Sequence, residues 1–242
     1  MRIIAIVMAL SAIAFGLFTV VFGIVGPLQA PHAFHNAVVA SLLVVISAPA
    51  AIAVARSPTD SEPALVVLAV LAIAGLATMA ASLTIDPFTM PFVVSVGLLW
   101  ALAPYRVQLL PSGRPSPILI VVVLAAAIPL AVYAYGNAEL QRTDTTSAHD
   151  AFFHWVETSF YAVAALGLGL LAALRPSAHR LAAWSGGLAL VVLGAASLML
   201  EGYASSLPSP WGWTALVGGI AFIAVARWEA RGSGSPRAIA EN

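Results

Sequence analysis

Residues 154–175 read HWVETSFYAVAALGLGLLAALR, with a histidine at the first position and an arginine at the last. Beyond its first two turns the stretch is almost wholly apolar. Its 21 intervals correspond to about 31 Å of α-helix, close to the roughly 30 Å of a bilayer's hydrocarbon core. The stretch therefore predicts one membrane crossing, with a polar residue at each boundary.

The same spacing recurs along the chain. An arginine lies 20 or 21 residues from a histidine or a carboxylate in three further pairs: His35 and Arg56, Asp86 and Arg106, and Arg180 and Glu201. Eight apolar spans follow from these intervals and from the Pro-rich or polar breaks between them. They cover residues 3–28, 33–55, 63–84, 88–105, 117–137, 151–174, 181–202 and 211–227.

Composition supports a polytopic α-helical membrane protein. Of the 242 residues, 61% are hydrophobic and 8% are charged, whereas about a quarter of the residues of soluble proteins are charged. A transmembrane barrel would show alternating segments of about ten residues, and these apolar runs are longer. We expect one all-α transmembrane domain over residues 1–231 and a disordered tail at 232–242.

Two residue types are missing from the chain. Cysteine is absent, which excludes disulfides, thiolate metal sites and iron–sulfur clusters. Lysine is also absent, so arginine and the amino terminus carry every fixed positive charge. No basic run suits nucleic acid, and the lipid bilayer is the partner that composition implies.

Arginine predicts the orientation. With eight spans, one side of the membrane receives Arg142 alone, and the other receives the nine remaining arginines: Arg2, Arg56, Arg106, Arg114, Arg175, Arg180, Arg227, Arg231 and Arg237. The positive-inside rule makes the nine-arginine side cytoplasmic, with both termini inside an inner (plasma) membrane. A cleaved signal peptide is the alternative for the first span, but its apolar run exceeds the usual 7–15 or so residues.

A weak internal repeat relates the two halves of the chain, 1–110 and 115–231. His35 and His154 each precede an arginine by the same interval, at an offset of 119 residues. Four spans per half would make the halves parallel repeats about an axis along the membrane normal. That axis would place the two histidines in equivalent positions.

The outer boundary holds the residues that could carry chemistry. Asp150, His154 and Glu157 are three or four residues apart, so they share one helix face, and His149 precedes them. His32 and His35 open the second span, and Glu201 ends the seventh at the same depth. Imidazole with carboxylate suits zinc, copper(II) or iron. The candidate ligands of a metal ion, copper or zinc, are His32, His35, His149, Asp150, His154, Glu157 and Glu201. The alternative is that these side chains only hydrogen-bond to each other and to lipid headgroups.

Other residues receive structural interpretations. Tyr133, Tyr135 and Asn137 end the fifth span, and they are interpreted as interfacial anchors with Trp211 and Trp213. Mid-span Pro49 and Pro129 predict kinks. Ten glycines within the spans predict close helix packing: Gly16, Gly75, Gly97, Gly167, Gly169, Gly186, Gly187, Gly194, Gly218 and Gly219.

The chain resembles the multi-pass cytochrome c oxidase assembly factors of haem–copper oxidases. The similar stretches are His32 to His35 leading through Leu42-Leu43 to Pro49, then His149 to His154, then Glu201-Gly202-Tyr203 with Gly218-Gly219. It departs from that family in having His-x2-His for the first pair, in lacking a Trp-His-x-Pro element, and in having Trp213-Thr214 where Asp-Gln is expected. The resemblance implies a non-enzymatic protein that handles copper for a respiratory oxidase subunit.

Two other functions remain open from the sequence. A transporter fits parallel repeats, mid-span prolines and a carboxylate within the apolar zone. A membrane enzyme would use either zinc-activated water with Glu157 as base or a haem with His35 and His154 as axial ligands. The sequence does not show whether the two histidine pairs converge, because spacing sets only the depth of each side chain and packing sets the helix rotation.

Overall fold

The computed structural model describes residues 1–21, 29–105, 115–174 and 178–232, and it resolves the side chains from Met1 to Val21, from His32 to Tyr105, from Pro115 to Leu174 and from Ala178 to Arg231. Within these ranges every regular element is helical, which confirms the all-α prediction. In chain order the elements are α1 (Arg2–Val20), α2 (Gln29–Ser41), the π-helix η2 (Leu42–Ser47), α3 (Ala48–Arg56), α4 (Glu62–Ser82), α5 (Thr89–Ala101), α6 (Pro117–Thr143), α7 (Ala148–Ala151), α8 (His154–Leu174), α9 (His179–Met199) and α10 (Ser209–Gly232). All of the predicted tail except Gly232 lies outside the described residues.

Seven stretches of the described chain are long and apolar enough to cross a membrane. They are Arg2–Val20, His32–Arg56, Glu62–Ser82, Pro117–Thr143, His154–Leu174, His179–Met199 and Ser209–Arg231. The second of these combines α2, η2 and α3 into one continuous span. A membrane-embedded protein is therefore the class that the structure supports.

The fourth of the eight predicted spans, 88–105, is not confirmed as a membrane-spanning helix. Only the 13 residues of α5 are helical there, and 13 residues cover about 20 Å. Asp86 accepts hydrogen bonds from the backbone N–H groups of Phe88 (2.8 Å) and Thr89 (3.2 Å), so it caps the start of α5. Pro104 disfavours helix at the residue before it. The cap at Asp86 and the proline at 104 thus limit the helix, although the apolar segment 88–105 is long enough to cross a membrane.

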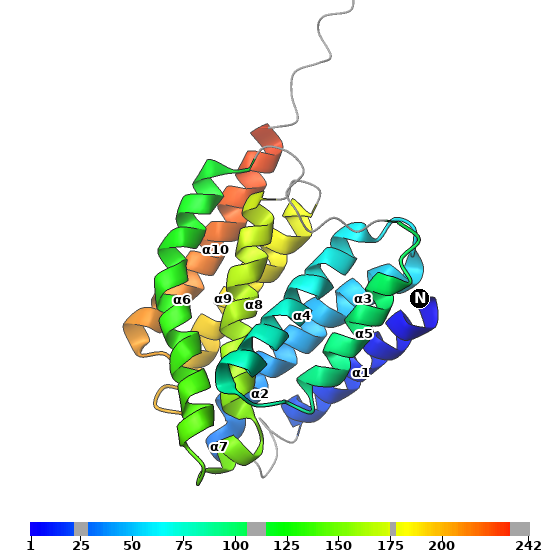
Figure 1. Cartoon of the computed structure of the whole chain (residues 1–242). Helices are drawn as coiled ribbons and strands as arrows, with labels where there is room; N and C mark the ends of the chain where they lie inside the picture. The colour runs from blue at the N-terminus through cyan, green and yellow to red at the C-terminus, as the bar shows by residue number, and fades with distance from the viewer. Residues whose placement is uncertain (22–28, 106–114, 175–177, 233–242) are drawn as a thin grey trace, which may run out of the picture.

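The two halves of the chain lie side by side. In Figure 1, α1 to α5 form one group and α6 to α10 form the other. The central helices are α4 and α8, whose most apolar windows are 67% and 78% buried, whereas the windows of α6 and α10 are only 22% buried. The predicted repeat of the two halves stays a prediction.

The outer surface of the peripheral helices is apolar. On α6, Val121, Leu124 and Ile128 are 66%, 62% and 74% exposed. Soluble monomers rarely expose a contiguous apolar surface of this kind, and such surfaces mark contact with a membrane or a partner. These side chains are placed to face lipid acyl chains.

Pro49 alters the span that contains it. Proline lacks the N–H that would bond to the carbonyl four residues earlier, and its ring collides with that carbonyl. The helix widens into η2 immediately before Pro49, and the N–H of Ala48 bonds to the carbonyl of Leu43, five residues back. Pro129, by contrast, lies within the continuous helix α6.

Glycines let α9 and α10 approach closely. A Cβ built on Gly194 would lie 2.4 Å from the backbone nitrogen of Leu216 and 2.5 Å from the carbonyl oxygen of Gly212, and one on Gly219 would lie 2.5 Å from the carbonyl oxygen of Gly187. Close packing is thus confirmed at these positions. Gly97 and Gly218, however, face open space, so the prediction is wrong for these two.

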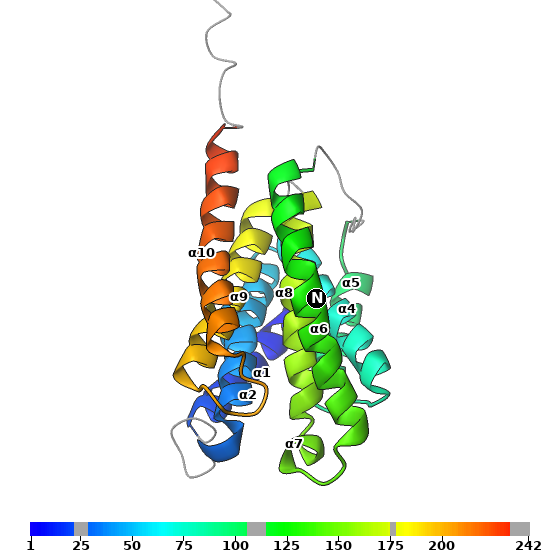
Figure 2. The same ribbon diagram turned by 90° about the vertical axis from the view of Figure 1, so that its left-hand side faces the viewer.

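The bundle has two chemically distinct ends, and Figure 2 shows how the helices run between them. One end carries the described arginines at the start of α1 and α9 and at the end of α3 and α10; the Nε of Arg2 donates to the carbonyl oxygen of Ala55 (3.0 Å). The other end carries the starts of α2 and α8, the short helix α7 and the loop between α9 and α10 (Figures 1 and 2). Arg142 lies there and donates to the carbonyl oxygen of Ala81 (3.0 Å).

Candidate functional site

Four histidines from three helices meet at the arginine-poor end. His32 and His35 lie in the first turns of α2, His149 lies in α7 and His154 is the first residue of α8. We call this group the histidine cluster. The two histidine pairs predicted at one depth therefore also face one another, which depth alone could not establish.

The imidazole rings of the cluster pack against each other. The centroid of His154 lies 4.6 Å from that of His32, 4.9 Å from that of His35 and 6.0 Å from that of His149. The centroid of His149 lies 4.9 Å from that of His32 and 5.0 Å from that of His35. Trp155 stacks on His149 with its ring centroid 4.8 Å away. The cluster is thus closed on one side by an indole ring.

Two histidines of the cluster are buried from solvent, and the other two are partly exposed. His35 has no exposed surface, and His149 is only 7% exposed. The Nδ1 atoms of His32 and His35 are buried and have no hydrogen-bond partner among the described residues. A buried polar atom without a partner costs roughly 1–3 kcal/mol, so a ligand bound at either nitrogen would recover part of that cost.

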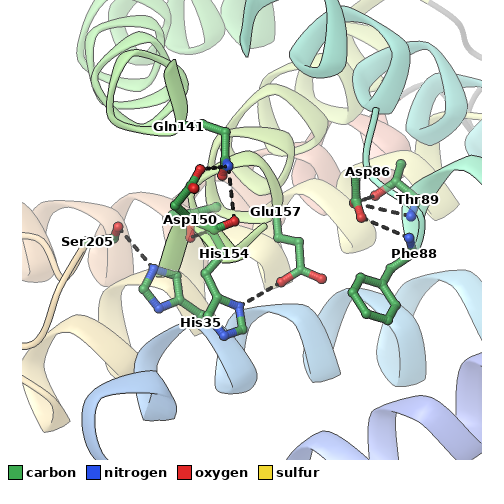
Figure 3. Close-up of polar contacts among 10 residues, drawn as sticks. His35, Asp86, Phe88, Thr89, Gln141, Asp150, His154, Glu157 and Ser205 are labelled. Carbon is green, nitrogen blue, oxygen red and sulfur yellow. Dashed lines mark hydrogen bonds and ion pairs between the residues drawn. The ribbon is translucent and has the colours of Figure 1, made fainter. Parts of the chain in front are cut away.

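Glu157 is bound to the cluster through His154. Its Oε2 lies 3.1 Å from Nδ1 of His154, and the carboxylate is 7% exposed (Figure 3). Glu157 also borders a small cavity of about 50 Å³ that η2 helps to line. The predicted helix face of His154 and Glu157 is therefore confirmed as a direct side-chain contact.

A chain of hydrogen bonds orients His35. Nε2 of His35 lies 3.2 Å from Oγ of Ser205 (Figure 3), and that hydroxyl donates to Oδ1 of Asn137 at 2.5 Å. The Nδ2 group of Asn137 donates to the carbonyl oxygen of Tyr133 (2.9 Å), and the hydroxyl of Tyr133 donates to the carbonyl oxygen of Ser205 (2.6 Å). The interpretation of Tyr133 and Asn137 as interfacial anchors is therefore wrong, because both residues belong to this internal network.

This network defines the tautomer of His35. The single hydroxyl proton of Ser205 goes to Asn137, so Oγ of Ser205 can only accept from His35. His35 then carries its proton on Nε2 and has a lone pair on the buried Nδ1, since a neutral imidazole has one N–H and one acceptor nitrogen. That lone pair has no donor among the described residues.

Asp150 and Glu201, two of the predicted ligands, lie apart from the rings. The carboxylate of Asp150 accepts from Nε2 of Gln141 (2.6 Å), which ties α7 to α6 (Figure 3). Glu201 is exposed in the loop after α9. Neither carboxylate has a described hydrogen bond to a histidine, so the structure gathers the imidazoles and Glu157 but not these two acids.

Asp86 is an acid that sequence reasoning did not select for the site. It is fully buried, and besides capping α5 it accepts a hydrogen bond from the hydroxyl of Thr89 (Figure 3). An Asp-Pro pair before an apolar run is typical of a helix start. Asp86-Pro87 is therefore a sequence signal from which the capping role could have been predicted. The contacts of Asp86 make it a structural residue at the edge of the site.

The loop that leads into α7 is organised by Asp144 and Ser147. The backbone N–H of Ser147 donates to Oδ1 of Asp144 at 3.2 Å. The Ser147 hydroxyl donates to the same carboxylate, and this hydrogen bond holds the pKa of Asp144 below its usual value. Ser147 also caps α7, since its Oγ accepts from the backbone N–H of Asp150. These bonds position the helix that carries His149.

Backbone strain concentrates at this end of the bundle. Leu83, Phe153 and Ser205 have φ angles of 54°, 60° and 64°, a region that costs a residue with a side chain of the order of 1–3 kcal/mol. Phe153 separates α7 from α8 immediately before His154, and Ser205 bonds to His35. Strain of this kind is common at functional sites, where the surrounding contacts hold the backbone in an unfavourable conformation.

The rings are close, but they are not arranged as metal ligands. In the described part of the chain, no group of three or more His, Asp and Glu side chains could hold a metal ion as placed. The planes of His35 and His154 are within 14° of parallel, so an ion in the plane of one ring lies outside the plane of the other. A shared ion would therefore require at least one of the two rings to turn about χ2, a soft torsion for histidine.

Comparisons with known proteins found no relative. No known protein family, curated protein or solved structure matches the chain. The function is therefore argued from the site alone.

Proposed function

We propose that this membrane protein binds a single transition-metal ion, zinc or copper, through the imidazoles of the histidine cluster. The observation that supports this proposal most directly is the buried lone pair on Nδ1 of His35, whose other nitrogen is committed to Ser205. Ligating histidines almost always have their second nitrogen bonded to a carboxylate, a carbonyl or water, which fixes the tautomer.

His154 supplies the same arrangement with a carboxylate. With Glu157 ionised, Nδ1–H of His154 donates to it across 3.1 Å, and Nε2 keeps the lone pair that a metal needs. Carboxylate–histidine–metal triads of this form increase the basicity of the ligand. Glu157 is thus an orienting residue in this proposal and not a ligand.

The spacing of the rings suits one ion better than a haem. Metal–nitrogen bonds near 2.1 Å place an ion about 3.2 Å from each ring centroid, so two imidazoles on a tetrahedral ion have centroids about 5 Å apart. Of the five ring separations given above, four are 4.6–5.0 Å. Axial imidazoles on opposite faces of a haem iron have centroids about 6 Å apart, and His35 and His154, at 4.9 Å, are too close.

The biological setting that we propose is assembly of a respiratory oxidase at an inner membrane. Its support is the resemblance of the His32 and His149 segments, together with Pro49, to oxidase assembly factors. The histidine cluster lies at the arginine-poor end, which the positive-inside rule assigns to the outer face. An outward-facing imidazole site would serve to accept or deliver copper there.

Metal analysis of the detergent-purified full-length protein tests the proposal. The purified protein is loaded with zinc or copper and desalted, and zinc, copper and iron are then measured by mass spectrometry. We expect about one ion per chain in the wild type and less than about a tenth of that in the double variant His35→Ala/His154→Ala, since two of the four imidazoles around the ion are then lost.

His179→Gln is the matched control, because it removes the one histidine outside the cluster and should retain the metal. Retention of metal by the double variant would assign the ion to another site. A wild type without zinc, copper or iron above background would overturn the proposal.

A further inference from the structure

A second polar feature lies at the opposite end of the bundle, between α9 and α10. There the two helices border a groove of about 280 Å³ whose polar lining consists of His179, Arg180, Trp184, Arg227 and Arg231. The residue pairs 180/184 and 227/231 are each four apart, so each pair shares one face of its helix. Three guanidinium groups therefore line one hollow.

The positive charge of the groove is not neutralised within the described chain. No carboxylate is among the described residues that line it. Neither of the described ion pairs, Arg142 with Glu139 and His154 with Glu157, involves an arginine of the groove. Glu229, the acid nearest in sequence, accepts from the hydroxyl of Ser116 on α6 at 2.6 Å, and it is not among the lining residues.

Trp184 and His179 shape the groove. The guanidinium carbon of Arg227 lies 5.6 Å from the ring centroid of Trp184, a cation–π contact that holds this arginine beside the hollow. His179 contacts the carbonyl oxygens of Ala172 (3.1 Å) and Ala226 (3.0 Å), which ties α9 to both α8 and α10. The walls of the groove are thus fixed by side chains on both helices.

We infer that this groove binds the phosphate of an anionic phospholipid headgroup, of the phosphatidylglycerol type. Arginine pairs with phosphate oxygens through two parallel N–H···O bonds, and basic pockets between membrane helices bind such headgroups. The inference does not depend on the proposed metal site, which lies at the other end of the molecule.

The position of the groove favours a lipid over free phosphate. It lies at the end of two membrane-spanning helices, beside Trp184, which is 41% exposed. Tryptophan prefers the headgroup level of a bilayer. Apolar side chains such as Val217 and Ile220 are exposed on α10, so a lipid with its phosphate in the groove would have an acyl surface available below it.

Native mass spectrometry of the full-length protein in detergent tests the inference. The protein is titrated with phosphatidylglycerol, with phosphatidylcholine of the same chain length, and with inorganic phosphate. We expect a preference for phosphatidylglycerol that the double variant Arg227→Gln/Arg231→Gln weakens about 30-fold, since each arginine near an anionic lipid contributes roughly 5-fold. Arg56→Gln, an exposed arginine at the same end but outside the groove, should leave binding within about 2-fold of wild type.

Three results would overturn the inference. They are equal binding of phosphatidylcholine, unchanged phosphatidylglycerol binding by the double variant, and inorganic phosphate displacing the lipid at equimolar concentration, which would identify a site for free phosphate. Unchanged helix content by circular dichroism and an unchanged thermal unfolding midpoint in Arg227→Gln/Arg231→Gln would show that its fold is intact.

Discussion

Ser205 shows how one residue can control the chemistry of the site without being a ligand. It lies in the loop between α9 and α10 at a φ of 64°, held by the hydroxyl of Tyr133 and by Asn137. From that position its Oγ accepts the Nε2 proton of His35. The strained loop therefore selects which nitrogen of His35 is available to a metal.

Replacement of Ser205 by alanine should weaken metal binding. Ser205→Ala keeps the backbone but removes the acceptor of His35, and loss of such an orienting partner typically lowers metal affinity about 10–100-fold. Zinc or copper affinity, measured by competition with a chelator in detergent, checks this expectation. A change below about 2-fold would contradict the orienting role that we give to Ser205.

Ser206→Ala is the matched control for this measurement. The hydroxyl of Ser206 donates to the carbonyl oxygen of Tyr203 in the same loop (2.7 Å), and it has no described contact with the histidine cluster. Its loss should leave metal affinity unchanged. Equal effects of the two substitutions would indicate a general disturbance of the loop.

At the scale of elements, the α9–α10 contact depends on the absence of side chains. Gly194→Ala would place a methyl group 2.4 Å from the backbone nitrogen of Leu216, and backbone cannot move aside as a flexible side chain can. Overpacking of this kind costs about 1–3 kcal/mol. We expect the free energy of unfolding, measured by denaturant titration in detergent, to fall by that amount.

Gly218→Ala separates this packing effect from helix propensity. A Cβ at Gly218 meets nothing within 4 Å, and alanine in a helix interior is favoured over glycine by about 0.5–1 kcal/mol. The substitution should be neutral or slightly stabilising. Destabilisation by both substitutions would argue against backbone contact as the cause.

At the scale of the whole molecule, the depth of each side chain in the membrane was predictable from the sequence, whereas the rotation of each helix about its axis was not. A 20- or 21-residue interval measures distance along a helix, which is why His35 and His154 were predicted at one boundary. Packing of α2, α7 and α8 decides that their rings face each other, and no spacing within one helix contains that information.

The sequence-based predictions that failed, and the residue that they missed, have a common physical reason. Ser205 reaches His35 across 170 sequence positions, and its residue type is unremarkable in a loop. Glu201 lies at the predicted level but is exposed, because level does not specify the side of the bundle that a loop residue faces. The span 88–105 was predicted by apolar content, whereas capping by Asp86 and the proline at 104 limit its helix.

The orientation of the whole bundle yields the last prediction. The arginine-rich end should be retained on the cytoplasmic side, because arginines flanking membrane helices resist translocation. The chain has no cysteine, so single cysteines can be introduced at exposed Thr145, before α7, and at exposed Thr59, before α4. In intact cells a membrane-impermeant maleimide should label Thr145→Cys, whereas Thr59→Cys should react only after permeabilisation.

The reverse pattern would invert the topology and put the histidine cluster on the cytoplasmic side. Labelling of both in intact cells would contradict the assignment of Thr145 and Thr59 to opposite ends of the bundle, on which the outward-facing site depends.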